Sequence, residues 1–336
     1  MTLLTAGLVV LALAARTDTT LNVAPSSRLK LENFGGDIQV QTWSRNAVRI
    51  EADHGRRVDV TIDRSSGELT LGAETRFGAP ATVDWRLTVP ATLSLELSGV
   101  YSDVRVDGVS GEVRVETVQG DVTITGNPKE VSASSVQGQV RIEGGHGRIE
   151  ASSVNERVTL LDASGEIQAE SVNGDVLIRG GGSDRVEAST VNGNILFEAA
   201  FAKSGEYSFS SHGGGLYVAV PQSADVEVSV STYQGSFEST FPYTSDSRRK
   251  RDFSFTLGSG DARLDLESFQ GEIRLFRPGE SVPDLPDFFD REDSAGHGAK
   301  SKAKSEVKAS LKDKKSGSKD PRNGDESDEE SEGEDE

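Results

Sequence analysis

A column of Val and Ile residues spaced nine apart constrains the fold of this chain more than any other feature. A second column, two residues later, alternates large with small side chains after its first member. The repeat is therefore eighteen residues long and consists of two unequal halves of nine. The first column is Val113, Val122, Val131, Val140, Ile149, Val158, Ile167 and Val176, followed after one extra residue by Val186 and Ile195. The second column is Val115, Ile124, Ala133, Ile142, Ala151, Leu160, Ala169, Ile178, Ala188 and Phe197.

Apolar and polar residues alternate within each half, as in Val140-Arg141-Ile142-Glu143. This period of two indicates a β-strand whose successive side chains point to opposite faces. At about 3.3 Å per residue, a nine-residue half holds one short strand and a corner, and coils stacked about 4.8 Å apart bring equivalent strands into register. The sequence therefore predicts an all-β fold, a β-solenoid with an alanine sheet facing an isoleucine sheet.

An antiparallel meander is the competing fold. Asn173-Gly174 and Asn192-Gly193 are typical of two-residue hairpin turns. A meander gives no reason for side-chain size to alternate with an eighteen-residue period, whereas a solenoid requires its two sheets to complement each other in volume. We therefore expect a solenoid.

Where each alanine half ends, a valine marks the corner. A hydroxyl residue precedes this valine, and an amide residue follows it. These polar residues form either a strip that recognises a ligand or a set of hydrogen bonds to the corner backbone and between coils, and stacking favours the structural interpretation. Corner glycines are expected to supply positive φ, and Glu156 interrupts them. The hydroxyls are Thr117, Ser135, Ser153, Ser171 and Thr190, the valines Val118, Val136, Val154, Val172 and Val191, the amides Gln119, Gln137, Asn155, Asn173 and Asn192, and the glycines Gly120, Gly138, Gly174 and Gly193.

The pattern divides the chain into five segments. Residues 1–15 are an uncharged apolar leader, too short to span a bilayer but typical of a signal peptide with a site at Ala12-Leu13-Ala14. Residues 23–107 form an N-terminal β-section, and 108–200 form the regular coils. Residues 201–277 form wider coils with Tyr233-Gln234-Gly235 and Phe269-Gln270-Gly271 at corners. The composition of residues 278–336 predicts a disordered charged tail.

Net charge and its distribution limit the partners. The formal charge is −19, so the folded body is not expected to bind nucleic acid. Eight lysines lie between Lys300 and Lys319, so contact with a membrane is expected only through this tail, which is otherwise a solvating segment. The partner expected for an exported protein of the periplasm or cell surface is an unknown envelope protein or a polysaccharide.

Two groups of residues are candidate contacts. Arg248, Arg249, Lys250 and Arg251 form the basic run of a charged loop, which is either a solvated tip or a contact for an anionic partner. Leu177 and Leu196 occupy outward positions of the isoleucine sheet. They are either covered by a C-terminal segment, which we favour, or they form a contact patch.

No catalytic, metal-binding or cofactor-binding constellation is visible. The chain has no cysteine, and its four histidines lack ligand spacing. A carbohydrate-active β-helix enzyme would need clustered carboxylates, whereas Glu116, Glu150, Glu170 and Glu187 are scattered. A third alternative is a solenoid that polymerises through its end coils, but net charge and long flanks oppose this.

Three segments resemble the putative-adhesin family of bacterial exported proteins, a domain of unknown function. They are an entry strand with Gly-Asp-Ile and a Trp segment, a strand ending in Val-Pro followed by Gly-Asp-Val repeats, and a closing repeat after Gly-Ser-Gly. The resemblance covers residues 28–277. It implies a β-solenoid in the envelope or at the surface, with no enzymatic residues and no named partner.

Overall fold

The computed structural model describes residues 15–24, 26–65, 67–75, 80–243 and 251–280. The chain divides into two units, Met1–Val282 and Pro283–Glu336, and every described residue belongs to the first. The predicted leader (apart from Ala15), the charged tail from residue 281 onward and the Arg248–Lys250 part of the basic run lie outside the described residues. The described part of the chain is built from strands and short connections, and it contains no helix.

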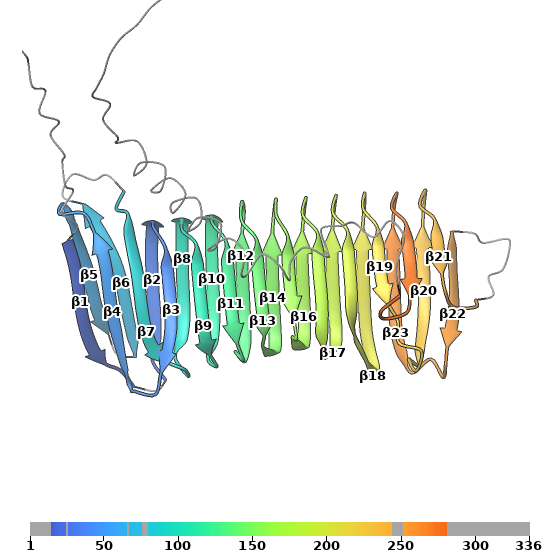
Figure 1. Cartoon of the computed structure of the whole chain (residues 1–336), viewed down its shortest axis with the longest axis horizontal. Coiled ribbons are helices and arrows are strands. Elements are labelled where there is room, and N and C mark those ends of the chain that lie inside the picture. The colour runs from blue at the N-terminus through green and yellow to red at the C-terminus, as the bar shows by residue number, and fades with distance from the viewer. Residues whose placement is uncertain (1–14, 25, 66, 76–79, 244–250, 281–336) are drawn as a thin grey trace, which may run out of the picture. The chain divides into compact units, whose positions relative to one another are not determined.

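The strands of this unit form two ladders with the core between them. Within each ladder, the strands lie side by side along the long axis of the unit (Figure 1). The alanine sheet contains, in spatial order, β5 (Val58–Ser65), β6 (Glu68–Thr75), β2 (Arg28–Gly35), β8 (Ser94–Tyr101), β10 (Glu112–Gln119), β12 (Glu130–Ser135), β14 (His146–Ser153), β16 (Ser164–Ser171), the later parts of β17 (Val176–Thr190) and β18 (Ile195–Ser211), β23 (Ala262–Ser268), β20 (Val226–Thr232) and β22 (Asp252–Leu257). The isoleucine sheet contains β1 (Ala15–Asn22), β4 (Ala47–His54), β7 (Val83–Pro90), β3 (Ile38–Trp43), β9 (Val104–Val109), β11 (Val122–Gly126), β13 (Val140–Gly144), β15 (Val158–Leu161), the first parts of β17 and β18, β19 (Leu216–Ala219), β24 (Ile273–Phe276) and β21 (Phe237–Ser239).

The middle coils confirm the predicted solenoid and its register. Strands of successive coils pair in parallel, with Val131 opposite Ile149 and Val140 opposite Val158, eighteen residues on in each case. The antiparallel meander is excluded here, because a meander pairs consecutive strands in opposite directions. The members of both apolar columns are buried between the two sheets, so each coil supplies a thin slice of one continuous core.

The core changes where the coils become wider. Val186 pairs with Tyr207, twenty-one residues later, and Ala188 pairs with Phe209. Phe197 packs against both rings, with ring centroids 5.6 Å from Tyr207 and 5.0 Å from Phe209. The Tyr207 hydroxyl donates to the Ser183 carbonyl at 2.6 Å and accepts from the Ala202 amide at 2.7 Å. The larger rings therefore fill the extra volume that a longer coil encloses.

Both ends of the stack depart from simple winding. At the C-terminal end, β23 and β24 lie between the coil of β18 and β19 and the coil of β20 and β21, although they follow both in sequence. At the N-terminal end, β2 lies between β6 and β8. The outermost pairs β1–β4, β4–β7, β5–β6 and β20–β22 are antiparallel. Reversed strands thus terminate the alanine sheet at both ends, whereas in the isoleucine sheet the reversed strand β4 lies one place inside the N-terminal edge and β21 at the other edge pairs in parallel.

The β-structure begins earlier than the sequence indicates. The strand β1 precedes residue 23, where the first β-section is expected to start. Its residues alternate between half-buried and exposed, so it lies at the edge of the isoleucine sheet without a fully buried face. A strand with no buried face has no apolar alternation from which to predict it.

Candidate functional site

The corner that leads from the alanine sheet to the isoleucine sheet, which we call the glycine corner, is held together by buried hydroxyls. Ser135 Oγ donates to the Gly120 carbonyl of the preceding coil at 3.0 Å, and Ser153 Oγ donates to Gly138 at 2.9 Å. Ser171 Oγ also accepts from the Gly174 amide at 3.0 Å. These hydroxyls satisfy the corner backbone, as the structural interpretation predicts, and they are not available to a ligand.

The amide column beside them is a ladder. Asn173 Nδ2 donates to Asn155 Oδ1 at 2.9 Å, and Asn192 Nδ2 donates to Asn173 Oδ1 at 2.7 Å. Asn155 Nδ2 in turn donates to the Val136 carbonyl at 3.0 Å. Exposed amides of successive coils therefore bond to one another and to the backbone, which leaves fewer of their donors free for recognition.

The corner glycines are needed for a reason other than the predicted one. Of the four, only Gly120 has a positive φ, at 149°. A Cβ on Gly138 would lie 1.8 Å from the Gly120 carbonyl oxygen, and one on Gly174 would lie 1.9 Å from that of Glu156. The requirement is the close approach of one coil to the next. Positive φ occurs instead at the opposite corner, at glycines such as Gly144 (87°).

Glu156 does not distort its corner in the way that a missing glycine suggests. Its φ is not positive, and its amide donates to Ser153 Oγ at 3.1 Å, like the glycine amides at equivalent positions. Its side chain is exposed, so the corner accommodates it by pointing the carboxylate into solvent.

A second ladder explains the Gly-Asp-Val repeat. Asp103 Oδ1 accepts from the Asp121 amide at 2.9 Å, and Asp121 Oδ1 accepts from the Gln139 amide at 2.8 Å. Asp84 Oδ1 accepts from the Asp37 amide at 3.0 Å. Burial raises the pKa of the Asp37 carboxyl, and the neighbouring Asp103 and Asp84 carboxylates raise it further. The aspartates thus hold the next coil in register, at the cost of stacking like charges.

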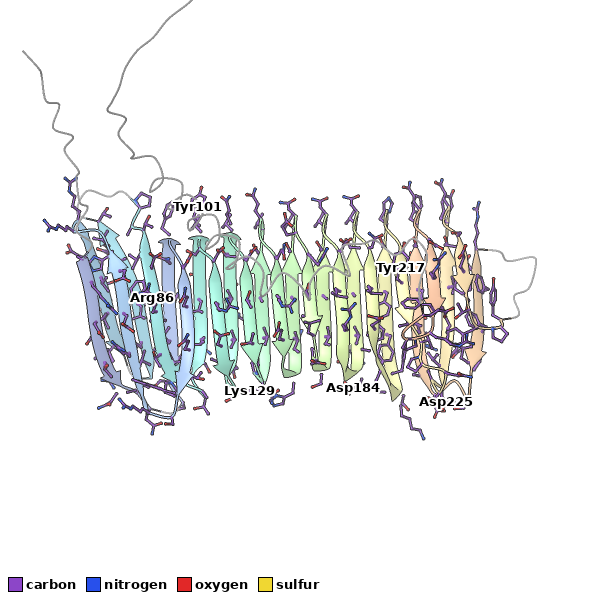
Figure 2. The ribbon with its side chains drawn as sticks, in the orientation of Figure 1. Arg86, Tyr101, Lys129, Asp184, Tyr217 and Asp225 are labelled. Atoms are coloured by element: carbon purple, nitrogen blue, oxygen red, sulfur yellow. The ribbon has the colours of Figure 1, made fainter. Side chains whose placement is uncertain are left out.

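The corner valines themselves form the most unusual surface of the described residues. Val118, Val136, Val154, Val172 and Val191 are 39–48% exposed, although they occupy equivalent positions on consecutive coils. Their side chains lie on the edge of the stack where Figure 2 shows Tyr101 and a row of projecting side chains. Burying a branched apolar side chain is favourable, and leaving it in water forgoes that free energy. An ordered row of such side chains therefore indicates a contact surface.

Aromatic residues extend this row at both ends. Phe34 and Tyr101 lie at its N-terminal end, with ring centroids 5.4 Å apart. At the C-terminal end, His212 stacks on Phe269 at 4.6 Å and Phe269 stacks on Tyr233 at 4.8 Å. The guanidinium of Arg251 lies 5.0 Å from the centroid of Tyr233. We call the whole row the apolar edge: Phe34, Tyr101, Val118, Val136, Val154, Val172, Val191, His212, Phe269 and Tyr233.

The two predicted contact groups are placed differently. Leu177 and Leu196 pair in adjacent coils as expected, but they are 1% and 0% exposed, so they present no open patch. Their cover by a C-terminal segment stays a prediction, since residues 281–336 lie outside the described residues. Of the basic run, Arg251 is exposed and lies on the ring of Tyr233, at the end of the apolar edge.

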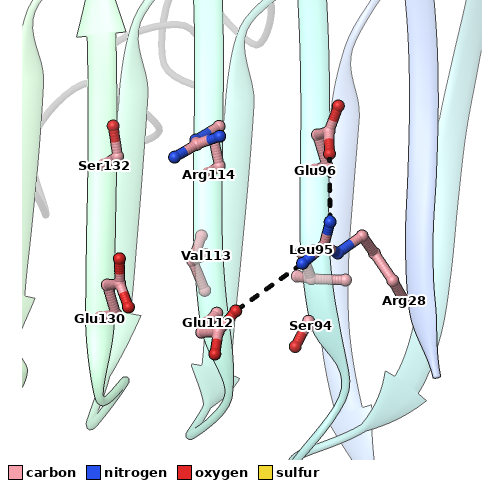
Figure 3. Close-up of a pocket in the computed structure, with 9 residues that line it drawn as sticks. All are labelled: Arg28, Ser94, Leu95, Glu96, Glu112, Val113, Arg114, Glu130 and Ser132. Carbon is pink, nitrogen blue, oxygen red and sulfur yellow. Dashed lines mark ion pairs between the residues drawn. The ribbon is translucent and has the colours of Figure 1, made fainter. Parts of the chain in front are cut away.

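Hollows on the alanine sheet are small and bounded by paired charges. One, of about 70 Å³, is crossed by Arg28, whose guanidinium lies 4.0 Å from Glu96 and 3.9 Å from Glu112 (Figure 3). A hydrogen bond from Lys129 lowers the pKa of Glu112. Another, of about 260 Å³, is lined mainly by serines, Glu150 and Glu170, and these carboxylates accept from Arg148 and Gln168. Glu96, Glu112, Glu150 and Glu170 of these hollows are thus engaged by neighbouring side chains, and Glu130 also lines the first hollow.

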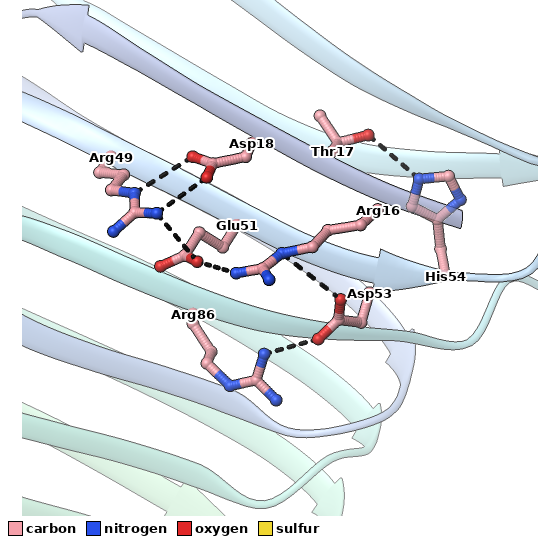
Figure 4. Close-up of polar contacts among 8 residues, drawn as sticks. All are labelled: Arg16, Thr17, Asp18, Arg49, Glu51, Asp53, His54 and Arg86. Carbon is pink, nitrogen blue, oxygen red and sulfur yellow. Dashed lines mark hydrogen bonds and ion pairs between the residues drawn. The ribbon is translucent and has the colours of Figure 1, made fainter. Parts of the chain in front are cut away.

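An ion-pair network covers the outer face of the isoleucine sheet at its N-terminal end (Figure 4). Arg49 donates two hydrogen bonds to Asp18 across the β1–β4 ladder, at 3.1 and 2.8 Å, and also pairs with Glu51 at 3.2 Å. Arg86 of β7 donates to Asp53 at 2.5 Å. The hydrogen bond from Arg49 lowers the pKa of Asp18. These ion pairs link β1, β4 and β7 to one another, so we interpret the network as structural.

Within the described residues, no group of three or more His, Cys, Asp or Glu side chains could hold a metal ion. A membrane-crossing helix is likewise not found in this part of the chain.

The exposed row was the feature that sequence patterns alone did not identify as a surface. Its signal is nevertheless present, because the corner valines recur with the coil but lie outside the strand alternation that marks the core. Their replacement by Phe269 and Tyr233 in the same corner formula is a second sign.

Comparison with known proteins places the chain. The model of the Toastrack DUF4097 family matches residues 14–275. Two solved structures are similar at 10% identity: a putative adhesin from Parabacteroides merdae ATCC 43184 (TM-score 0.45, 78% of this chain and 96% of that one) and one from Parabacteroides distasonis ATCC 8503 (TM-score 0.42, 79% and 98%). A third, a putative adhesin from Bacteroides fragilis NCTC 9343, has 14% identity, a TM-score of 0.32 and coverage of 78% and 97%. Among curated proteins, none matches the chain.

Proposed function

Because the chain belongs to the Toastrack DUF4097 family, as the resemblance of its entry, middle and closing segments indicates, we propose that it is a non-enzymatic binding module of the cell envelope. The apolar edge is its contact surface. The observation that carries this proposal is that five branched side chains stay 39–48% exposed in equivalent positions of consecutive coils. A stack built only for stability would place polar residues there.

At the glycine corner the polar groups are bonded within the stack and the valines are exposed, which supports contact through apolar side chains. The hydroxyls of the glycine corner are buried and bonded, the amides bond along the stack, and the edge and its amide column carry no formal charge in a chain that is 27% charged. An uncharged row excludes steering by charge, so its affinity comes from removing apolar area from water.

A non-enzymatic role agrees with the chemistry of the described surface. A glycoside hydrolase needs two carboxyl groups facing a substrate groove. Glu150 and Glu170 line a shallow hollow, but each accepts a hydrogen bond from a neighbouring side chain on its own strand. Polymerisation through the ends is disfavoured by the reversed strands β4, β5 and β22, which interrupt the parallel template.

Export to the periplasm or surface follows from the apolar leader and from the family resemblance, and it remains part of the proposal. The test is to express the full chain in its native cell, separate cytosol, periplasm and envelope, and measure where it is retained. We expect envelope retention that survives high salt, because apolar contacts are not screened.

The matched comparison uses two double variants. Val136→Lys with Val172→Lys places charges on the apolar edge and is expected to release the protein from the envelope fraction. Ser134→Lys with Ser189→Lys adds the same charges to the outer face of the alanine sheet and should leave retention unchanged. A protein confined to the cytosol, or equal retention of both variants, would contradict the proposal.

A further inference from the structure

We propose that the apolar edge is the interface of a homodimer in which two copies lie side by side and antiparallel. This rests on the proposed function only in taking the edge as a contact surface, and it names the partner as a second copy of this chain.

The chemistry of the edge favours a protein partner over a polysaccharide. Sugars are held by hydrogen bonds and by the open faces of aromatic rings. Here Asn173 and Asn192 donate to the neighbouring amides of their own column. Both faces of Phe269 are covered by His212 and Tyr233, and Arg251 lies on Tyr233. Aliphatic groups and ring edges are left for contact, and these suit another apolar protein surface.

Charge then favours a second copy. The chain carries a net charge of −19, so two copies repel each other over most approaches. The edge and the amide column beside it are uncharged, and only Glu156 brings an acid to the next position of the glycine corner in the middle coils. Contact along this line is therefore the approach at which self-association meets the least repulsion.

The order of residues along the edge is self-complementary. The register gives the order of positions along the edge as Phe34, Val100, Val118, Val136, Val154, Val172, Val191, His212, Phe269 and Tyr233. Val100 is half-buried, and the exposed Tyr101 of the edge is the next residue, level with Gln119 of the amide column. Rings occupy both ends, with Phe34 at the first position and His212, Phe269 and Tyr233 at the last three, and valines occupy the middle. A two-fold axis between Val154 and Val172 places Val154 against Val172, Val136 against Val191 and Phe34 against Tyr233, as an isologous interface requires. Val118 then faces His212 and Val100 faces Phe269, so apolar groups and rings meet along the whole contact.

The exposed area of the edge is close to what a standard interface buries. The exposed parts of the five valines and of Phe34, Tyr101, Phe269 and Tyr233 amount to roughly 700 Å² per copy, near the about 800 Å² that each partner buries in a standard interface. Spacing between coils of about 4.8 Å is the same in both copies, so side chains can remain in step along the whole contact.

The first experiment measures the association of the full chain by sedimentation equilibrium over a concentration series. We expect a monomer–dimer equilibrium. Val154→Lys should weaken it by more than about tenfold, because like charges meet near the axis in an apolar contact. Ser152→Lys, on the same coil but on the outer face of the alanine sheet, should leave it unchanged. A monomer at every concentration, or equal effects of both variants, would overturn the proposal.

The second experiment fixes the direction of the two copies. The chain has no cysteine, so a single introduced thiol is a clean probe. In the antiparallel dimer, Val154→Cys lies about one coil spacing, or about 5 Å along the axis, from its mate, while Val118→Cys lies about five spacings away, or about 24 Å. A short thiol-specific crosslinker should join the first variant and not the second. Crosslinking of both to the same extent would overturn the antiparallel arrangement.

The outcomes separate this inference from the proposed function. If the chain is strictly monomeric, but Val136→Lys with Val172→Lys still releases it from the envelope fraction, the dimer is refuted and the proposed binding module is retained. A dimer that is confined to the cytosol would keep the interface and remove the envelope role.

Discussion

Ile142 in the middle of the stack and Trp85 near its N-terminal end are both completely buried, but their surroundings differ in kind. Ile142 lies between Ile124 and Leu160, its equivalents one coil before and one coil after. Trp85 donates through Nε1 to Asn33 Oδ1 at 3.2 Å, and Asn33 donates in turn to the carbonyls of Gly36 and Val83 and to Ser102 Oγ. The middle repeats one contact, whereas the end depends on contacts that occur once.

The C-terminal end makes the same point with different side chains. Phe237 packs against Tyr243 and Phe253 with centroids 5.1 Å apart in both cases, and against Phe255 at 5.9 Å. This aromatic cluster lies at the last strands of the stack, where no further coil of the described residues covers the core. Each end therefore needs a specific closure, as expected for repeat architectures with capping units.

The largest expected effect breaks the repeated contact of the middle. Ile142→Asp places an unpaired charge between the two sheets, and we expect it to lower the free energy of unfolding by at least about 4 kcal/mol. Thr123→Asp puts the same group on the outer face of the same sheet, opposite Arg105 and Arg141, and should be tolerated. Urea unfolding followed by circular dichroism measures both. Similar losses would mean that the inward and outward faces are misassigned.

The next effect concerns the approach of one coil to the next. Gly174→Ala places a Cβ 1.9 Å from a backbone oxygen, which cannot move without moving the neighbouring coil. We expect a loss of about 1–3 kcal/mol in unfolding free energy, since Glu156 shows that a coil can adjust to a Cβ at the equivalent position. Gly55→Ala, in a turn of the N-terminal end with no atom within 4 Å of the new Cβ, should change it by less than about 0.5 kcal/mol. A tolerated Gly174→Ala would show that the coils are not in close contact at this corner.

A smaller effect tests the unique contacts of the N-terminal end. Trp85→Phe removes the indole donor and leaves Asn33 Oδ1 without this bond, which we expect to cost about 1–3 kcal/mol. Trp43 also donates, to the Ala47 carbonyl at 2.7 Å, but it is only half-buried. Trp43→Phe should therefore cost less in the same urea titration, and the reverse order would argue against the Asn33 network as the closure.

The smallest effect is a difference in pH dependence between two aspartates of the N-terminal end. Burial raises the pKa of Asp37 above its usual 3.8, so its neutral form favours folding, and this contribution is lost as pH rises through the raised pKa. We expect Asp37→Asn to be more stable than the wild type at pH 7 and equal to it below the ordinary pKa.

Asp18 provides the opposite sign. A hydrogen bond from Arg49 lowers its pKa below 3.8, so its charge contributes stability that is present above this value and lost as pH falls through the lowered pKa. Asp18→Asn should therefore be slightly less stable than the wild type at pH 7. Urea midpoints from pH 2 to 7 compare the variants, and shifts of the same sign would contradict the assigned causes.

The predictability of the molecule follows the same division. The middle coils could be predicted because every core position occurs many times at a fixed spacing, so Val140, Ile142 and Ile149 identify one another. The order of β23 and β20 and the place of β2 could not, because strand exchange leaves no periodic signal. The sequence also could not show why Gly138 is a glycine, because a close approach of two coils and a positive φ both require this residue.

The candidate surface was only partly predictable. The valine column and its aromatic continuation are visible in the sequence, but their exposure depends on the corner projecting outward. For Leu177 and Leu196 the exposure was predicted wrongly in the other direction. Alternation places them on the outer face of the sheet, but both are buried.

The unfolding free energy of Val154→Lys, measured in urea at dilute protein concentration, tests most directly whether the apolar edge exists for contact and the repeated interior for stability. We predict a value within about 0.5 kcal/mol of the wild type, since the side chain is 39% exposed and a lysine ammonium there remains in water. A loss of the size expected for Ile142→Asp would show that the valine column belongs to the core, and it would contradict the assignment of this edge as a binding surface.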